Sequence, residues 1–294
     1  MQPDSRQPIR TLSSGSLELD VLLSGGPRIV GLRYRNSQNL LAEVPEIAVP
    51  TPYGEFHYIG GHRLWYAPEA MPRSYIPDSE GLISTELSDG ILLQGNKEPG
   101  TGISKSIEIH LRPDLPQVTL VHHLENHGLW EVELAPWAIT MFPLGGVAIL
   151  PYQAEKVDRD GLLPDRHVTF WPYTSIHDPR LKLDDDFVFV YANSNHSSCK
   201  IGTFNPRGWL AYWNNGILFQ KRFVPIANVR YPDKGCNSEI YCDEHFIELE
   251  SLSPMVRLAP GNTVTYQEDW YLFSDLDQDF LPGKVLDRLP PFMQ

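Results

Sequence analysis

The chain has 294 residues, 41% of them hydrophobic, and carries a formal net charge of −13. This hydrophobic content is ample for a packed core, in one large domain or two average ones. The negative charge and the lack of a stripe rich in lysine and arginine argue against nucleic acid as a partner, because phosphate binding depends on clustered basic residues.

The sequence shows no pattern of a targeting or membrane segment. The first fifteen residues, MQPDSRQPIRTLSSG, contain no apolar stretch of a secretion signal, and no apolar run approaches membrane-spanning length. We therefore expect a cytoplasmic protein without a membrane partner. Three cysteines, Cys199, Cys236 and Cys242, show no CxxC or Cys/His spacing, so neither a disulfide framework nor a structural zinc site is predicted.

Short runs with the composition and alternation of β-strands recur along the chain, whereas 26 prolines and 22 glycines leave few windows for a regular helix. In chain order the runs are 16–23, 28–34, 81–87, 90–94, 103–111, 117–124, 130–140, 167–172, 187–191, 201–204, 208–213, 217–223, 240–242 and two strands within 245–273. Helical patterns are limited to 37–41 and 276–280. Without a linker or an internal repeat, this series predicts one all-β domain over residues 1–294, a large sandwich or barrel.

The segment Gly60–Glu69, GGHRLWYAPE, combines a glycine pair, an imidazole, a guanidinium and two aromatic rings. Glycine allows close approach of the backbone, arginine donates to hydroxyl or carboxylate oxygens, and aromatic rings stack on apolar ring faces. The segment is therefore predicted to be a strand of a binding site, with His62, Arg63 and Trp65 as candidates. The alternative is a structural turn in which Arg63 pairs with a carboxylate such as Glu69.

Three histidines, His122, His123 and His127, lie close together in the chain. Alternation sends His122 and His123 to opposite faces of a strand, so at most one of the two faces a cleft. This spacing does not assemble three metal ligands without help from elsewhere, and no metal site is predicted. The alternative interpretation is one buried, hydrogen-bonded histidine with the others on the surface.

Polar and aromatic residues interleave across several later strands, which suggests a long cleft for a hydroxylated ligand. Trp137 is either a platform for a sugar ring or a core residue, and Tyr173, His177, Asn237 and Glu239 are further candidates for binding. Asp233 lies near the last two in a turn-rich segment, where a bound cation is conceivable, but no ligand-loop motif supports one.

The closing segment 245–273 contains two predicted strands around a turn at Pro260 and Gly261. Along the first strand, alternation places Glu248 and Glu250 side by side on one face. Two neighbouring carboxylates repel each other when both are ionised, which raises one pKa and suits a general base near neutral pH. A solvated outer face of an antiparallel sheet is the alternative interpretation of the same alternation.

The order of these segments resembles the galactose-mutarotase-like family of aldose 1-epimerase relatives, which are β supersandwiches. The similarity extends over essentially the whole chain. Its motifs are LELDVLLSGGPRIVGLRYRNSQNLL, GGHRLWYAPE with a later LAPW, as in a family of uncharacterised proteins, and FIELESLSPMVRLAPGNTVTYQEDWYLF. The resemblance implies a single-domain supersandwich with few short helices, a sugar or sugar derivative as ligand and no cofactor.

In mutarotases a glutamate of the closing strands takes the proton of the anomeric hydroxyl and a histidine of a central strand protonates the ring oxygen. The resemblance implies that Glu248 or Glu250 is the base and that Arg63 binds substrate. Where the acid histidine is expected, this chain reads ENHGLWEVELAPWAITMF, with Trp137 and Thr140, and the histidine is missing from that place. His62, His123 or His177 are the candidates to replace it.

Three functions follow from this comparison. The first is a mutarotase-like epimerase that uses general acid and base catalysis. The second is a carbohydrate-binding protein that has lost the acid, because a fold does not fix function. The third, by analogy with related sandwiches, is a polysaccharide lyase or hydrolase, which the expected cytoplasmic location makes less suitable. The scarcity of Arg and Lys motifs favours a neutral sugar over a sugar phosphate.

Overall fold

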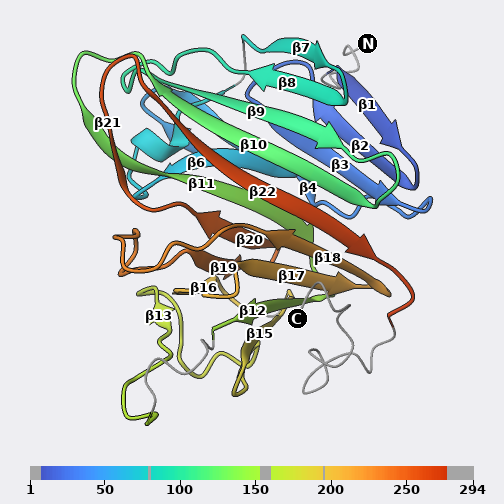
Figure 1. Cartoon of the computed structure of the whole chain (residues 1–294), viewed down its shortest axis with the longest axis vertical. Helices are drawn as coiled ribbons and strands as arrows, with labels where there is room; N and C mark the ends of the chain where they lie inside the picture. Colours follow the sequence, from blue (N-terminus) through green and yellow to red (C-terminus); the bar gives the residue numbers. More distant parts are fainter. Residues whose placement is uncertain (1–7, 79–80, 153–159, 195, 277–294) are drawn as a thin grey trace.

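The computed structural model describes residues 8–78, 81–152, 160–194 and 196–276. Their strands form two large antiparallel sheets and one hairpin (Figure 1). In spatial order the first sheet consists of β1 (Ile9–Ser14), β2 (Leu17–Leu22), β3 (Arg28–Tyr34), β6 (His62–Ala67), β11 (Val132–Pro143), β20 (Phe246–Leu252), β19 (Ser238–Cys242), β16 (Cys199–Thr203) and β13 (Thr169–Phe170), and β21 (Val256–Leu258) also pairs with β11. The prediction of an all-β fold is confirmed.

The second sheet covers one face of the first. Its strands, in spatial order, are β14 (Leu181–Leu183), β15 (Phe187–Tyr191), β12 (Val147–Pro151), β17 (Trp209–Asn214), β18 (Ile217–Arg222), β22 (Thr263–Phe273), β10 (Gln117–Asn126), β9 (Ile103–Leu111), β8 (Gly90–Gln94) and β7 (Ile83–Leu87). The hairpin consists of β4 (Glu43–Thr51) and β5 (Gly54–Gly60).

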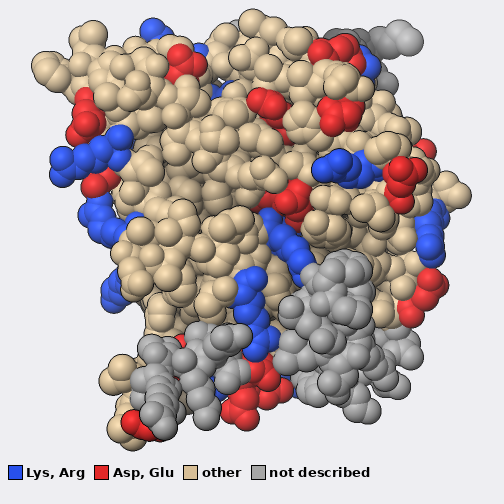
Figure 2. All heavy atoms as spheres, viewed as in Figure 1, with Lys and Arg blue, Asp and Glu red and all other residues tan. Residues whose placement is uncertain are grey.

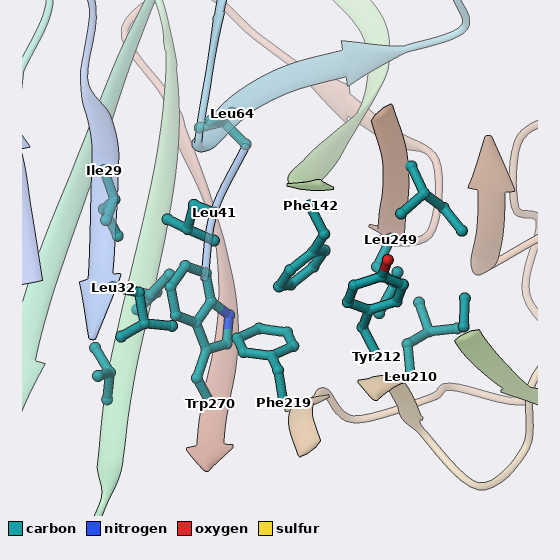
Figure 3. Close-up of a cluster of buried hydrophobic side chains, with 14 of the residues drawn as sticks. Ile29, Leu32, Leu41, Leu64, Phe142, Leu210, Tyr212, Phe219, Leu249 and Trp270 are labelled. Carbon is teal, nitrogen blue, oxygen red and sulfur yellow. The ribbon is translucent and has the colours of Figure 1, made fainter. Parts of the chain in front are cut away.

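A continuous cluster of buried apolar side chains joins the two sheets. Figure 3 shows part of it, where Phe142 and Leu249 from the first sheet meet Tyr212, Phe219 and Trp270 from the second. Truncating one such aromatic side chain to alanine typically costs about 3–5 kcal/mol, because the cavity left behind is only partly filled. The inner face of the first sheet is therefore fixed by packing. A second, smaller buried cluster, which includes Phe56 of the hairpin with Trp65 and Trp137, covers part of its outer face.

Many predicted strands match the structure closely, including β3, β8, β9 and β15. The sequence prediction missed β1, β4, β5, β12, β14 and β21, and it placed a short helix at 37–41, where the backbone is irregular. Of the second predicted helix, residues 277–280 lie outside the described residues. The one helix in the described ranges is a single 3₁₀ turn, η1 (Arg73–Tyr75), at a position that was not predicted to be helical.

The closing strands β20 and β22 belong to different sheets, although they are close in sequence. The predicted turn at Pro260 and Gly261 is present, and Gly261 has a φ of 79°, a conformation that glycine adopts without strain. After β20 the chain pairs with β11 through β21, and it then crosses to the second sheet through the turn at 259–262. Alternation in β20 is as predicted, with Ile247 and Leu249 in the core between the sheets.

Basic and acidic side chains are interspersed among uncharged ones on the face shown in Figure 2. The described residues contain no helix long and apolar enough to cross a membrane.

Candidate functional site

A cavity of about 520 Å³ opens on the outer face of the first sheet, beside the hairpin β4–β5. Most of its walls are aromatic or charged side chains from strands far apart in sequence. The lining residues are Tyr58, Arg63, Trp65, Glu69, Tyr75, Trp137, Trp171, Tyr173, Ser197, Ser198, Lys200, Tyr241 and Glu248. We refer to this cavity as the aromatic pocket. It offers flat apolar surfaces together with charged hydrogen-bonding groups.

Strand register brings the polar residues of the aromatic pocket together. Lys200 on β16 is directly opposite Tyr241 on β19, which is directly opposite Glu248 on β20. In a second row, two residues away along the strands, Glu239 is directly opposite Glu250. Because residues i and i+2 of a strand share a face, both rows lie on the outer face of the sheet.

Glu248 lies in the wall of the pocket beside a stacked arginine. Nη2 of Arg63 is 2.9 Å from Glu248 Oε1. The guanidinium carbon Cζ lies over the rings of Trp65 and Tyr58, at 4.5 and 5.5 Å from their centroids. Burial raises the pKa of Glu248 to about 7, although the charge of Arg63 opposes this shift. Glu248 is therefore a carboxyl group that can both accept and release a proton near neutral pH.

Glu250 lies below the pocket wall in a buried ion-pair cluster with Lys200. Lys200 Nζ is 2.7 Å from Glu239 Oε2 and 2.8 Å from Glu250 Oε2, and the indole N–H of Trp137 donates to the same Glu250 oxygen at 2.7 Å. The ammonium also faces the rings of Trp137 and Trp171, 4.6 and 4.8 Å from their centroids. Of the two acids predicted on this face, Glu248 lines the pocket, whereas Glu250 forms an ion pair with Lys200 below it.

The two carboxyl groups below Lys200 share one ammonium. Burial raises the pKa of Glu239 well above its ordinary value, the lysine opposes this shift, and nearby Glu250 reinforces it. Burial alone would lower the pKa of Lys200, but the two carboxyl groups outweigh it and raise that pKa well above its ordinary value. The two carboxyl groups thus favour the cationic form of Lys200, and burial favours the protonated form of Glu239.

The predicted residues Arg63, Trp65, Trp137, Tyr173 and Glu248 come together in the aromatic pocket. Trp137 also packs edge-on against Trp65, with centroids 5.4 Å apart, and is only 3% exposed. Both interpretations of Trp137 therefore apply, because its ring belongs to a buried aromatic cluster and reaches the pocket surface. The alternative pairing of Arg63 with Glu69 is wrong, since Arg63 pairs with Glu248.

His62 does not reach the pocket, contrary to the sequence prediction. It alternates with Arg63 on β6 and points to the inner face, where its Nε2 is 2.8 Å from Nε2 of His122 and its Nδ1 is 2.9 Å from Thr140 Oγ1. Burial lowers the pKa of His122 to about 4 and that of His62 well below its ordinary value. Both imidazoles are therefore neutral, hydrogen-bonded interior groups.

The other two candidate histidines also lie away from the pocket. His123 is on β10 of the second sheet, where its Nε2 is 2.9 Å from Glu108 and its Nδ1 is 3.1 Å from Thr265. His177 lies exposed in the segment after β13 and is not among the lining residues. No histidine of the described residues lines the aromatic pocket.

Asn237 and Glu239 are structural neighbours of the site and do not form its surface. The side chain of Asn237 accepts from the backbone N–H of Asn205 at 2.7 Å and donates to its carbonyl at 3.0 Å. Glu239 is bound to Lys200. Since both side chains already have protein partners, the cation considered for them and Asp233 gains no support from their geometry.

One group of potential metal ligands is present in the described residues, at His62, His122 and Glu268 in the interior. Their ligand atoms lie within 4.8 Å of one another. Lys221 Nζ, however, is already 2.9 Å from Glu268 Oε1 and hydrogen-bonds the carbonyls of Ala138 and, on β20, Leu249. The ammonium of Lys221 already supplies the positive charge that a metal ion would bring to this carboxylate. The cluster therefore does not need a metal ion to balance its charge.

The glycine pair at the start of β6 serves the backbone and not a ligand. A side chain on Gly60 would clash with the carbonyl oxygen of Ala42 at 2.0 Å, and one on Gly61 with that of Ile29 at 1.9 Å. Both glycines have positive φ, 103° and 71°. They let the chain turn closely against two neighbouring segments and so set the direction in which β6 enters the site.

Several residues of the aromatic pocket were not predicted individually. Tyr58 comes from β5, a strand that the sequence pattern did not reveal, and Tyr75 comes from the unpredicted 3₁₀ turn. Lys200 and Tyr241 are on predicted strands, but only their pairing across strands places them beside Glu248. A search for charged residues on the same face of adjacent strands could have found Lys200.

Comparison with solved structures places this architecture among known folds. A candidate aldose 1-epimerase from Escherichia coli K12 is similar over 91% of this chain and 99% of its own, with a TM-score of 0.56 and 16% identity. A galactose mutarotase-like protein from Lactobacillus casei is similar over 90% of this chain and 100% of its own, with a TM-score of 0.52 and 8% identity. A TPR-domain containing protein from Parabacteroides distasonis matches 96% of this chain with half of its own, at a TM-score of 0.62 and 12% identity.

The chain therefore has a β-sandwich fold of the galactose mutarotase-like type. At these identities the similarity concerns the fold alone. A scan of protein families found no match, and a search of curated proteins found no similar sequence.

Proposed function

We propose that the aromatic pocket binds a sugar and that the protein interconverts its anomers, with Glu248 as the general base. The observation that carries this proposal is the buried Glu248 carboxyl, with a pKa of about 7, in a pocket walled by aromatic rings. Aromatic faces stack on the apolar faces of sugar rings, and a base works best when its pKa is near the operating pH. The mutarotase-like fold supports the same reaction.

In this mechanism the carboxylate of Glu248 takes the proton of the anomeric hydroxyl, and the bond between the anomeric carbon and the ring oxygen breaks. The ring oxygen receives a proton, and the open aldehyde rotates about its first carbon–carbon bond. Closure on the other face reverses the proton transfers. Arg63, 2.9 Å from Glu248, keeps the carboxylate oriented and supports its ionised form.

The charges of the site favour a neutral sugar. The pocket-lining cations Arg63 and Lys200 are both paired with carboxyl groups, Arg63 with Glu248 and Lys200 with two buried ones. A phosphate or carboxylate on the ligand would have to displace one of these pairs. We therefore propose neutral aldoses as the first substrates to test.

A ligand-observed NMR experiment with neutral, acidic and phosphorylated aldoses tests this proposal, because it records saturation transfer and anomer exchange together. We expect accelerated exchange for a neutral aldose, reduced about 10²–10⁴-fold in Glu248→Gln. The control is Glu108→Gln, a carboxylate on the second sheet that contacts His123 and should leave the exchange rate unchanged. Full acceleration by Glu248→Gln would refute the role of Glu248.

The second candidate is a carbohydrate-binding protein without catalysis. It is favoured by the lack of a pocket histidine among the described residues, because mutarotases use one as the acid. Saturation transfer without faster exchange for every aldose that binds would support this candidate over the epimerase.

A further inference from the structure

The proposed reaction needs a group that protonates the ring oxygen, and the described part of the pocket offers no histidine for it. Arg63 is unsuitable because a guanidinium does not release its proton in proteins. The hydroxyl of Tyr75 donates to Glu69, and that of Tyr241 has Asp243 Oδ2 at 3.1 Å and Ser198 Oγ at 2.9 Å. Tyr58 and Tyr173 also line the pocket. Among these donors we single out Lys200 because a second, fully buried carboxyl group, that of Glu239, lies 2.7 Å behind its ammonium.

Building on the proposed epimerase, we propose that Lys200 donates the proton to the ring oxygen and that Glu239, behind it, replenishes the proton across their 2.7 Å ion-pair contact. Lys200 is the catalytic residue of this pair because it lines the pocket that we propose to bind the sugar. Glu239 acts through Lys200 and is a positioning residue. The pair takes the place that the mutarotase histidine has in related enzymes.

The reach of the lysine side chain makes this geometry feasible. Lys200 starts on β16, yet its Nζ lies 2.8 Å from Glu250 Oε2 on β20, two strands away. Glu248 and Glu250 are two positions apart on that strand, roughly 7 Å along its axis. The ammonium and the Glu248 carboxyl are thus spaced to act on the ring oxygen and the anomeric hydroxyl of one sugar ring.

Two carboxyl groups lie behind the lysine in the protein interior. Glu239 and Glu250 are directly opposite in register and both are 0% exposed. Oε1 of Glu250 and both carboxyl oxygens of Glu239 have no hydrogen-bond partner among the described residues, and Glu239 meets Lys200 as an ion pair. Two buried carboxyl groups with one ammonium between them are electrically neutral when one carboxyl is protonated, and burial favours the protonated form of Glu239. It is 2.7 Å from Lys200 Nζ.

The proton transfers balance over one turnover. As the bond between the anomeric carbon and the ring oxygen breaks, its electron pair goes to the ring oxygen, which takes a proton from Lys200. The Glu239 carboxyl then passes its proton to Lys200. On closure the ring hydroxyl attacks the aldehyde carbon and returns a proton to Lys200, which returns one to Glu239, while Glu248 gives its proton to the carbonyl oxygen. No co-reactant is consumed.

The test measures anomer exchange against pH, together with sugar affinity, for the wild type, Lys200→Gln, Lys200→Arg, Lys200→Ala and Glu239→Gln. We expect Lys200→Gln and Lys200→Arg to lose about 10²-fold or more of the exchange rate. Glu239→Gln should lower the rate less and move the alkaline limb of the pH profile. Added methylammonium should restore exchange in Lys200→Ala, which a purely structural role would not predict.

Lys221→Gln is the matched control, since Lys221 is also a fully buried lysine paired with a glutamate but lies between the sheets. It should lower stability and leave the exchange rate per folded molecule unchanged. If Lys200→Gln exchanges at the wild-type rate while Glu248→Gln does not, the lysine proposal is refuted and the epimerase stands. If Tyr241→Phe loses the rate and Lys200→Gln keeps it, the donor is the tyrosine. If the wild type accelerates the anomer exchange of no aldose, both the epimerase proposal and the lysine proposal are refuted.

Discussion

The unusual pKa of Glu248 should be measurable as a pH-dependent stability difference between the wild type and Glu248→Gln. The pKa rises from an ordinary 4.5 to about 7 on folding, so the folded protein binds this proton more tightly than the unfolded chain. Stability therefore falls as pH rises from 4.5 to 7 and levels off above 7. The glutamine variant has no such proton and lacks this component of the pH dependence.

The size of the effect follows from the two pKa values. A shift of one unit corresponds to about 1.4 kcal/mol, and between pH 5 and pH 8 the wild type should lose about 2.5 kcal/mol relative to the variant. Urea denaturation at both pH values, followed by tryptophan fluorescence, gives the free energy of unfolding of each protein. Other ionisable groups contribute to both proteins and cancel in the comparison.

Glu108→Gln is again the control, because Glu108 is on the other sheet and partly exposed. Its stability relative to the wild type should change by less than about 1 kcal/mol over the same range. A stability difference between Glu248→Gln and the wild type that is the same at pH 5 and pH 8 would refute the inference that Glu248 titrates near neutrality.

Three further predictions concern the framework of the site. Gly61→Ala should destabilise the protein by about 2 kcal/mol or more, because the φ of 71° and the Ile29 carbonyl leave no room for a side chain; an unchanged melting temperature would contradict this. Trp137→Phe removes the indole donor of Glu250 and should cost about 1–3 kcal/mol in urea denaturation, so an unaltered midpoint would argue against that hydrogen bond. His122 should stay neutral until about pH 4, so its stabilising effect is complete above pH 6.5 and about 3 kcal/mol is lost on acidification; an NMR titration midpoint near 6.5 would contradict this.

The strand content and the faces of individual strands could be predicted from sequence because alternation is a local property with a period of two. It placed Glu248 and Glu250 on one face of β20, and it separated His122 from His123. The short strands β1 and β14 escaped detection because their residues are mostly exposed and show little apolar alternation.

Which face of each strand becomes a site and which becomes core was decided only by tertiary packing. On β6 the sequence offered both His62 and Arg63, and stacking of the second sheet buried the histidine and left the arginine for the pocket. Cross-strand register brought Lys200 next to residues some 40 to 50 positions later in the chain, Glu239 and Glu250. Sequence alternation thus determined the strands and their two faces, whereas sheet stacking and strand order, which depend on long-range contacts, selected the residues that meet.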